Sequence, residues 1–466
     1  MKLNLTGRPA RRGRAAIVVA LAATMTLAGC AGSSAGNDSK GSGSGSGSGN
    51  SSDQVSQADI DKALHTPTKL TFWTWVPDIE NEVALFEKAY PDIDVTVENV
   101  GQGLDHYQKV RTALKSGEGA PDVVQLEYQY IPSFVLTDSL LNLKPYGADD
   151  IAGDYVDWVW HQVSTDDGVW AIPQDTGPMG NLYRDDIMQA AGVTEAPKTY
   201  DDYAADAQKV KDATGSYISN FPGNDPAQVV GLLWQAGVKP FGYDGDKTVT
   251  INVNSDVAKQ VMSFWQGLID KDLVSTDADF NDEYYQGLSN DKYAGWLTAA
   301  WAPIFLQGTV ENTAGKWRAA PLPQWSADQN VSGNWGGSSD AVLATSKNPI
   351  AAYELAKWIN NDVSSTSMFA SKQFLFPAAK NVLDDASFTD APVDFFGGQK
   401  VNELFSQIGS TVDTDFQWLP FTEFAYSSFN ETVGKAISEK GDLSAALDDW
   451  QDQLVGYAKQ QGFTVA

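Results

Sequence analysis

The sequence predicts an α/β protein made of two lobes, each built on a mainly parallel sheet flanked by helices. Its 466 residues exceed what one hydrophobic core normally serves, so we expect two lobes. Residues 69–76 alternate apolar and polar side chains, as a strand does, and the apolar residues that follow have helical spacing. A second strand is expected at 93–97. Such a strand–helix–strand unit normally joins parallel strands.

A stretch in the middle of the chain, residues 168–185, is the expected crossing between the lobes. Residues 169–172 form a short apolar strand, and Pro173 ends its ladder because proline has no N–H to donate. A flexible segment rich in glycine and proline, 177–180, then leads into a helix. We expect Asp175 to face the cleft between the lobes. An ordinary strand–loop–helix corner is the alternative interpretation.

The rest of the first lobe extends its sheet. A helix with one apolar face ends at Gly117, and a further strand is expected at 121–126. In open α/β sheets, ligands collect outside the carboxyl ends of the strands. That rule singles out Trp75, Glu127 and Tyr128. A carboxylate in a solvated loop is the plain alternative for Glu127.

The second lobe is expected to contain helices and one hairpin. Thr199 and Asp202 have the spacing of a capping box, which predicts a helix start. Residues 231–237 predict a helix followed by a turn, and 243–251 predict a hairpin with an Asp-Gly turn. A stripe of apolar residues that begins at Val257 predicts a packing face rather than a site.

The first residues indicate an exported protein. Residues 1–29 have a basic start and an apolar run too short to span a bilayer, which is typical of a signal peptide. The run ends in a sequence that resembles the lipobox of bacterial lipoproteins, in which Cys30 would become the lipidated first residue. An ordinary signal peptide with an incidental cysteine is the alternative. Residues 30–57 then form the lipidated cysteine and a Gly/Ser tether, because such a composition cannot bury enough to fold.

Composition excludes several classes of partner. The formal net charge of −28 would repel nucleic acids and anionic lipids, but not a neutral or cationic solute. A single cysteine rules out internal disulfides and cysteine-based metal sites, and three scattered histidines make a histidine metal site improbable. We therefore expect no metal and no cofactor. Fifteen tryptophans provide many flat apolar faces suited to sugar rings, although most tryptophans of any protein serve packing.

An enzyme is the main competing hypothesis. The chain contains no Gly-x-Ser-x-Gly elbow, no His-Glu-x-x-His, no phosphate-binding loop and no dinucleotide fingerprint. Sixty acidic residues nevertheless allow the carboxylate pair of a glycosidase. A lipid-anchored glycoside hydrolase is therefore the alternative function, and a structural or adhesive surface lipoprotein is a further one.

Several motifs in the expected order resemble family 1 extracellular solute-binding proteins, the sugar-capturing subunits of ABC importers. The central stretch 168–185 resembles the family's hinge signature, although Arg184 stands where the family usually has a second Tyr or an Asn. The aromatic segment 72–75, together with Pro-Asp strand 121–126, resembles the family's opening pattern. Residues 295–303 resemble its return crossing, and 333–343 its third crossing.

The resemblance implies a type II periplasmic-binding-protein-like fold with three hinge crossings. It places 58–174 and 299–335 in the first lobe, and 175–298 and 336–466 in the second. It implies a monomer on the outer face of the cytoplasmic membrane that captures a neutral oligosaccharide by hinge closure and delivers it to ABC permease subunits. The residues expected to bind this ligand are Trp75, Glu127, Tyr128, Asp175, Trp234, Trp301, Trp335, Gly337 and Trp418.

Overall fold

The computed structural model describes residues 54–373 and 375–466, which belong to one compact unit. The predicted signal peptide, Cys30 and most of the predicted tether lie outside these residues. The first helix, α1, begins at Gln57, with Ser56 accepting a hydrogen bond from the Asp59 N–H as its cap. Across the described ranges, no helix combines the length and the apolar composition needed to cross a membrane.

The first sheet has the strand order β2-β1-β3-β10-β4. Strand β1 is parallel to both β2 and β3, as the strand–helix–strand pattern predicts. Strand β10 comes from much later in the chain and runs antiparallel to β3 and β4. The bounds of these strands are β1 Thr68–Trp73, β2 Ile93–Glu98, β3 Val123–Glu127, β4 Ile172–Pro173 and β10 Ser338–Val342.

The second sheet is antiparallel, so the expectation of a mainly parallel sheet is wrong for this part of the chain. Its order is β8-β5-β9, with β5 Met179–Arg184 in the centre, β8 Gly295–Ala299 and β9 Trp317–Pro321. The central strand begins inside the segment 177–180, whose Gly and Pro content predicts flexibility. Gly180 fits there because a Cβ would lie 2.9 Å from the Phe405 ring and 3.0 Å from the Ala320 carbonyl oxygen.

The predicted hairpin is confirmed within a third, smaller sheet. Strands β6 Phe241–Tyr243 and β7 Thr248–Ile251 pair antiparallel, and β11 Thr464–Val465 joins β7 in parallel. Strand β11 is therefore an edge strand of the sheet that contains the hairpin.

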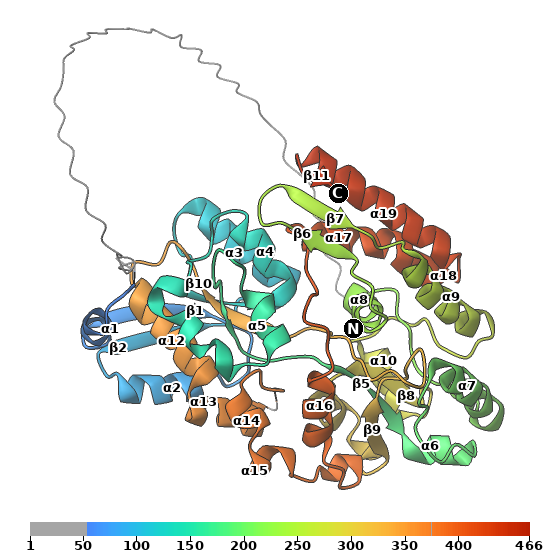
Figure 1. Ribbon diagram of the computed structural model, residues 1–466. Helices are drawn as coiled ribbons and strands as arrows, with labels where there is room; N and C mark the ends of the chain where they lie inside the picture. Colours follow the sequence, from blue (N-terminus) through green and yellow to red (C-terminus); the bar gives the residue numbers. More distant parts are fainter. Residues whose placement is uncertain (1–53, 374) are drawn as a thin grey trace, which may run out of the picture. The chain divides into compact units, whose positions relative to one another are not determined.

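Helices cover these sheets (Figure 1). Helix α12 packs on β1, β3, β10 and β4, whereas α6 and α16 pack on β5 and β9. The capping box predicted at Thr199 and Asp202 is present at the start of α7. The α-helices are α1 Gln57–Leu64, α2 Glu80–Ala89, α3 Leu104–Ser116, α4 Ile131–Val135, α5 Asp157–Val163, α6 Asp185–Ala190, α7 Tyr200–Thr214, α8 Pro226–Gln235, α9 Asp256–Asp270, α10 Asp282–Ser289, α11 Ala302–Thr309, α12 Pro349–Asn361, α13 Val363–Met368, α14 Lys380–Leu383, α15 Ala386–Thr389, α16 Val401–Gly409, α17 Thr422–Phe429, α18 Lys435–Glu439 and α19 Leu443–Gln460.

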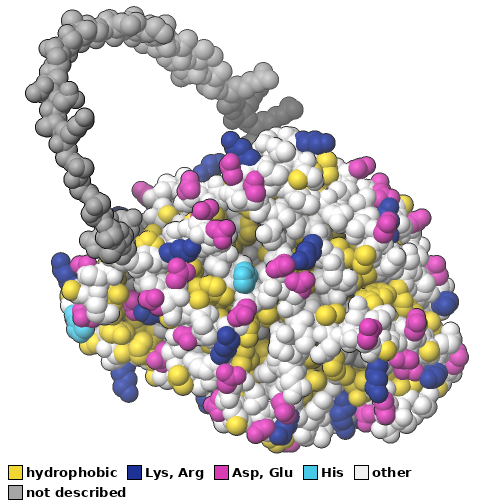
Figure 2. Space-filling view, viewed as in Figure 1, with side chains coloured by type: hydrophobic (Ala, Val, Ile, Leu, Met, Phe, Trp, Pro, Cys, Tyr) yellow, Lys and Arg dark blue, Asp and Glu magenta, His cyan; other side chains and the backbone are white. Residues whose placement is uncertain are grey.

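Short turns of other helix types complete the chain. The 3₁₀ turns are η1 Tyr128–Tyr130, η2 Lys144–Tyr146, η3 Ala148–Asp154, η4 Glu311–Thr313 and η6 Asp394–Phe396, and the π-helical turns are η5 Phe369–Gln373 and η7 Asn430–Gly434. Figure 2 shows acidic side chains spread over the visible face among lysines and arginines. The negative charge is therefore not gathered in one patch on this face.

Strand pairing runs against the predicted lobe boundaries at two places. Strand β9 falls within 299–335, predicted for the first lobe, but it pairs with β5. Strand β10 falls within 336–466, predicted for the second lobe, but it lies between β3 and β4. Hydrogen-bonded strands share one sheet, so both strands change lobe relative to the prediction. The division of the remaining residues stays a prediction.

Arg184, the residue that differs from the family's usual Tyr or Asn, is buried and forms ion pairs with two aspartates. Its side chain is 1% exposed, and its Nε and Nη2 each donate to one carboxylate oxygen of Asp186 at 2.7 Å. Its Nη1 lies 2.7 Å from Asp291 Oδ1. Both carboxylates remain partly exposed to solvent. The guanidinium thus joins the end of β5 to the start of α6 and to the turn after α10.

We expect Arg184→Met to lower the free energy of unfolding by about 2 kcal/mol, because it removes a bidentate charge-assisted pair from a buried position. Arg184→Lys should recover only part of this, since one ammonium cannot replace a planar fork. Urea titration of the full chain measures both. Lys198→Met, which breaks the exposed pair with Glu195, is the control and should change little. Equal losses in the Arg184→Met and Lys198→Met variants would contradict the assignment.

Candidate functional site

The crossing from β4 to β5 forms the floor of the candidate site. Asp175 follows β4, is 8% exposed and forms an isolated bridge with Pro377. Its Oδ1 accepts hydrogen bonds from the Ser338 N–H, at 2.9 Å, and from the Ser338 hydroxyl. Its Oδ2 accepts no hydrogen bond from the described residues. Burial raises the pKa of Asp175, although the bonds from Ser338 oppose the rise.

A second crossing, from β9 to β10, lies directly against the first. The Trp335 N–H donates to the Gly177 carbonyl at 2.8 Å, and a Cβ on Gly177 would lie 1.9 Å from the Trp335 carbonyl oxygen. Gly337 has φ +93°, and a Cβ there would meet the Tyr128 ring at 2.7 Å. Only glycine fits at 177 and 337, because no larger residue allows the two backbones to approach this closely.

Tyr128 joins the end of β3 to this floor. It is buried, and its hydroxyl donates to the Asp175 backbone carbonyl at 2.8 Å. Burial raises the pKa of Tyr128 well above its ordinary value, so the hydroxyl stays protonated and remains a donor. Tyr128, Asp175 and the Trp335–Gly337 segment, which lie far apart in the sequence, are therefore brought together.

A buried amide network ties Trp75 to the same floor. The Gln125 side-chain oxygen accepts from the Thr74 hydroxyl at 2.7 Å and from the Trp75 N–H at 3.0 Å. Its amide nitrogen donates to Ser338 Oγ at 2.8 Å and to Gln174 Oε1 at 3.0 Å. These hydrogen bonds fix the loop after β1 to the crossing that follows β4.

Trp75 is half-buried and packs edge-on against a neutral histidine. The centroids of the Trp75 and His106 rings lie 4.9 Å apart at 80°. Burial lowers the pKa of His106 to about 4, so its ring is uncharged at neutral pH. His106 Nε2 lies 2.9 Å from the Gln125 carbonyl oxygen. A packing role therefore accounts for His106.

Glu127 stands at the carboxyl end of β3 and is half-buried. The Tyr107 hydroxyl donates to its Oε2 at 2.9 Å and accepts from its backbone N–H at 3.1 Å. Burial raises the pKa of Glu127 to about 6, and the charges of Asp175 and Asp225 add to the rise. Glu127 is therefore not the freely solvated loop carboxylate of the plain alternative.

The sequence patterns did not single out two further aspartates, Asp225 beside Glu127 and Asp279 beside Asp225. Asp225 caps α8 by accepting the Ala227 N–H at 2.8 Å, and burial raises its pKa to about 6. Asp279 is 4% exposed, and burial and the Asp225 charge raise its pKa to about 8. Its Oδ1 accepts from Asn224 at 2.9 Å, while its buried Oδ2 has no partner among the described residues. For Asp225, the Asp-Pro dipeptide at 225–226 is the sequence signal of a helix start.

Trp301 and Trp335 form an aromatic corner above the floor. Their ring centroids lie 5.1 Å apart at 84°, and the Trp301 indole N–H donates to the Trp335 carbonyl at 2.6 Å. Trp335 is buried, whereas Trp301 is half-buried. Trp301 lies two residues after the end of β8 and is the N-cap residue of α11. The sequence analysis missed Phe280 and Phe305, which lie next to Trp301.

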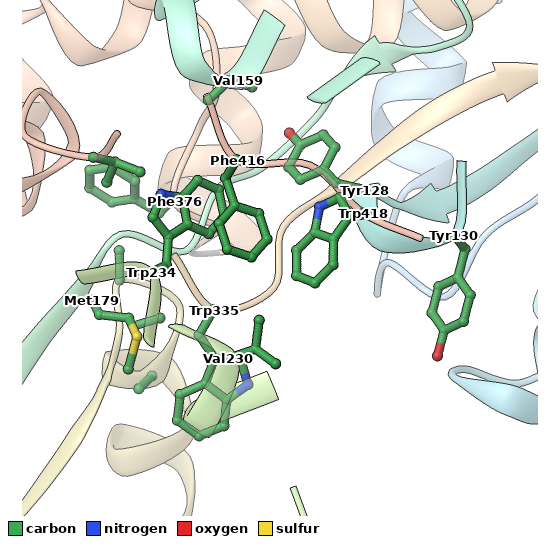
Figure 3. Close-up of a cluster of buried hydrophobic side chains, with 14 of the residues drawn as sticks. Tyr128, Tyr130, Val159, Met179, Val230, Trp234, Trp335, Phe376, Phe416 and Trp418 are labelled. Carbon is green, nitrogen blue, oxygen red and sulfur yellow. The ribbon is translucent and has the colours of Figure 1, made fainter. Parts of the chain in front are cut away.

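Trp234 and Trp418 have their indole groups enclosed by protein. Trp234 stacks on Phe416 with ring centroids 3.9 Å apart and 11° between the planes. The Trp418 N–H donates to Gln162 Oε1 at 2.6 Å. Figure 3 shows both indoles in the buried cluster that also contains Tyr128 and Trp335. The geometry gives Trp234 and Trp418 a packing role, and the ligand contact predicted for them remains untested.

A cavity of about 600 Å³ opens beside the corner. It lies between α11, which contributes Pro303, Ile304 and Gln307, and the segment 367–402. Its lining is mainly apolar and includes none of the predicted site residues, although Ala300 borders both the cavity and Trp301. In the part of the chain that the structure describes, no three His, Cys, Asp or Glu side chains are placed to hold a metal ion.

Comparisons with known proteins agree on one family. A family model described as bacterial extracellular solute-binding protein matches residues 72–364. An arabinooligosaccharide-binding protein of Halalkalibacterium halodurans is 25% identical over 379 residues, which cover 78% of this chain and 85% of the relative.

Solved structures extend the likeness to three dimensions. The binding protein associated with an ABC transporter of B. animalis subsp. lactis, in complex with β-1,6-galactobiose, is 32% identical with a TM-score of 0.75. The match covers 86% of this chain and 100% of that one. The galacto-N-biose/lacto-N-biose I-binding protein of Bifidobacterium longum is 26% identical with a TM-score of 0.75, and the match covers 86% and 99%. The predicted α/β, type II periplasmic-binding-protein-like fold is confirmed, apart from the antiparallel second sheet.

Asp340, in the middle of β10, is a buried carboxylate that makes the stability of the protein depend on pH. It is fully buried, and its Oδ2 accepts from Gln174 at 3.0 Å and from Asn360 at 2.8 Å, while Oδ1 has no partner among the described residues. Burial raises its pKa from 3.8 to about 7. The folded state therefore binds a proton that the unfolded state has released, and the stabilisation is complete below pH about 4 and lost as the pH rises through 7.

We expect Asp340→Asn to raise the free energy of unfolding relative to the original chain. This gain should be about 1–3 kcal/mol larger at pH 8 than at pH 5. The amide keeps both accepted bonds and carries no charge to bury at high pH. Urea titrations at the two pH values measure the difference. Asp212→Asn, at an exposed position on α7, is the matched control. A pH-independent difference for Asp340→Asn would refute the buried proton.

Proposed function

The chain belongs to the bacterial extracellular solute-binding protein family, and we propose that it captures a neutral oligosaccharide for an ABC importer. The ligand would bind where the ends of β1 and β3 meet the two crossings and the Trp301–Trp335 corner. This is the edge of the first sheet where ligands of open α/β folds bind.

One observation carries the proposal: Trp301 is a partly open indole held rigidly beside the floor. The bond from its N–H to the Trp335 carbonyl fixes the ring before any ligand arrives. A fixed aromatic face suits the apolar C–H face of a pyranose, and pre-organisation lowers the entropy lost on binding. The sugar-bound relatives described above support the same ligand class.

Carboxylates would supply orientation. The charge of Asp175 adds to the raised pKa of Glu127, and neither carboxylate forms an ion pair in the described chain. Hydrogen bonds from sugar hydroxyls to such acceptors contribute roughly 1.5–3 kcal/mol each against an unpaired alternative. Trp75, tied to Gln125, would close the site from the first sheet.

Capture would occur by hinge bending at the crossings, and closure would present a surface to membrane permease subunits. We place the protein on the outer face of the cytoplasmic membrane, anchored as a monomer through a lipid on Cys30. The protein would transform nothing and need no cofactor. Its acceptors would bind the sugar without cleaving it.

We expect intrinsic fluorescence of the full chain to show saturable, micromolar binding of neutral oligosaccharides, with the sugar recovered unchanged. The panel contains β-1,6-galactobiose, lacto-N-biose and arabino-oligosaccharides. Trp301→Ala should weaken binding at least tenfold through loss of the stacking face, and Asp175→Ala should also weaken it. Trp358→Ala, on α12 against Phe86 and Tyr90, is the matched control.

Other outcomes separate the competing hypotheses. Cleaved sugar would establish the lipid-anchored glycoside hydrolase. Binding of a polyamine that weakens steeply with salt would establish a cationic ligand, because only charged ligands are screened in this way. No response to any sugar, with binding of peptides or polyamines, would keep the fold and reject the carbohydrate.

A further inference from the structure

Two large apolar side chains stand exposed beside Trp301. Phe280 is 41% exposed and Phe305 is 42% exposed. Their ring centroids lie 6.4 Å apart, and they lie 6.0 Å and 5.7 Å, respectively, from the Trp301 ring. Single exposed apolar residues are ordinary, whereas contiguous ones mark binding surfaces. We call Phe280 and Phe305 the outer aromatic pair.

The backbone holds Phe280 in a costly conformation. Its φ of 54° lies in the left-handed region, which a bulky residue adopts only at an energetic cost. The preceding residue is clamped, because the Asp279 N–H donates to Asn224 Oδ1 at 3.1 Å and the Asn224 amide donates back to Asp279 Oδ1 at 2.9 Å. A strained residue that is clamped so as to present an apolar ring to solvent points to a ligand contact.

Helix geometry places Phe305 on the same side as Trp301. The two residues are four apart at the start of α11, a spacing that aligns side chains along one face. The residues of α11 that line the 600 Å³ cavity are Pro303, Ile304 and Gln307, so Phe305 does not belong to that cavity. The outer aromatic pair therefore continues the surface of Trp301 outward.

We propose that the outer aromatic pair is an additional sugar subsite that makes the protein prefer oligosaccharides to disaccharides. This inference rests on the proposed function. The corner of Trp301 and Trp335 takes the inner sugar units, and a longer chain reaches Phe280 and Phe305 with its outer units. The apolar C–H faces of those units cover the two rings and remove them from water.

The test is isothermal calorimetry of the full chain with matched sugar lengths. The probes are the disaccharide and the tetrasaccharide of the β-1,6-galactan series and of the arabinan series. In one of the two series, the original chain should bind the tetrasaccharide about tenfold more tightly than the disaccharide. This is the gain in affinity expected from stacking on one additional aromatic ring. Phe280→Ala should remove most of this ratio and leave disaccharide affinity within about twofold. Phe305→Ala should reduce the ratio, and Phe280→Tyr should retain it.

Val257→Ala, at a 43% exposed apolar position on α9, is the control for loss of a surface side chain. It should leave both affinities unchanged. Binding of a series with no preference for length, or a preference that survives Phe280→Ala, overturns the subsite while the proposed function stands. Binding of neither length in either series overturns this inference, and the proposed function falls with it when the whole sugar panel above also gives no response.

Discussion

The structure depends on the close approach of two crossing segments. The backbone at Gly177 contacts the backbone at Trp335, and Gly337 lies against Tyr128 and Asp175. A Cβ at 177 or 337 would collide with a carbonyl oxygen or an aromatic ring, so the approach requires glycine. Because these segments leave the first sheet here, the ends of β3 and β4 are brought next to Trp301. A site assembled from distant parts of the chain results.

The electrostatics of the site follow from burial without cationic partners. Glu127, Asp175, Asp225, Asp279 and Asp340 take part in none of the ion pairs of the described residues, and burial raises the pKa of each. A buried carboxylate without a cation either takes up a proton or accepts hydrogen bonds. Proton uptake applies to Asp340 and Asp279, whose pKa values are raised to about 7 and about 8, whereas accepted hydrogen bonds suit carboxylates that meet sugar hydroxyls. An overall charge of −28 is compatible with this site because a neutral solute experiences little of it.

Local patterns carried the predictions that were confirmed. The strand–helix–strand unit, the capping box at Thr199 and the Asp-Gly hairpin depend on neighbouring residues, so periodicity and turn chemistry suffice to find them. The start of the central strand of the second sheet escaped prediction because Gly177, Pro178 and Gly180 together resemble a loop. Its glycine at 180 serves packing against Phe405, a residue more than two hundred positions away. No local pattern contains that contact.

The sequence by itself determined the α/β class, and it predicts the two lobes, the export signal and the crossing at 168–185. Only the tertiary structure decided which aromatic residues face one another. The sequence alone does not distinguish Trp234 from Trp301. In the structure, Trp234 stacks on Phe416 and is buried, whereas Trp301 at the start of α11 keeps part of its side chain exposed. The same holds for Phe280, Asp225 and Asp279. Burial and proximity arise from contacts between distant segments, and these contacts set both the exposure of a ring and the pKa of a carboxylate.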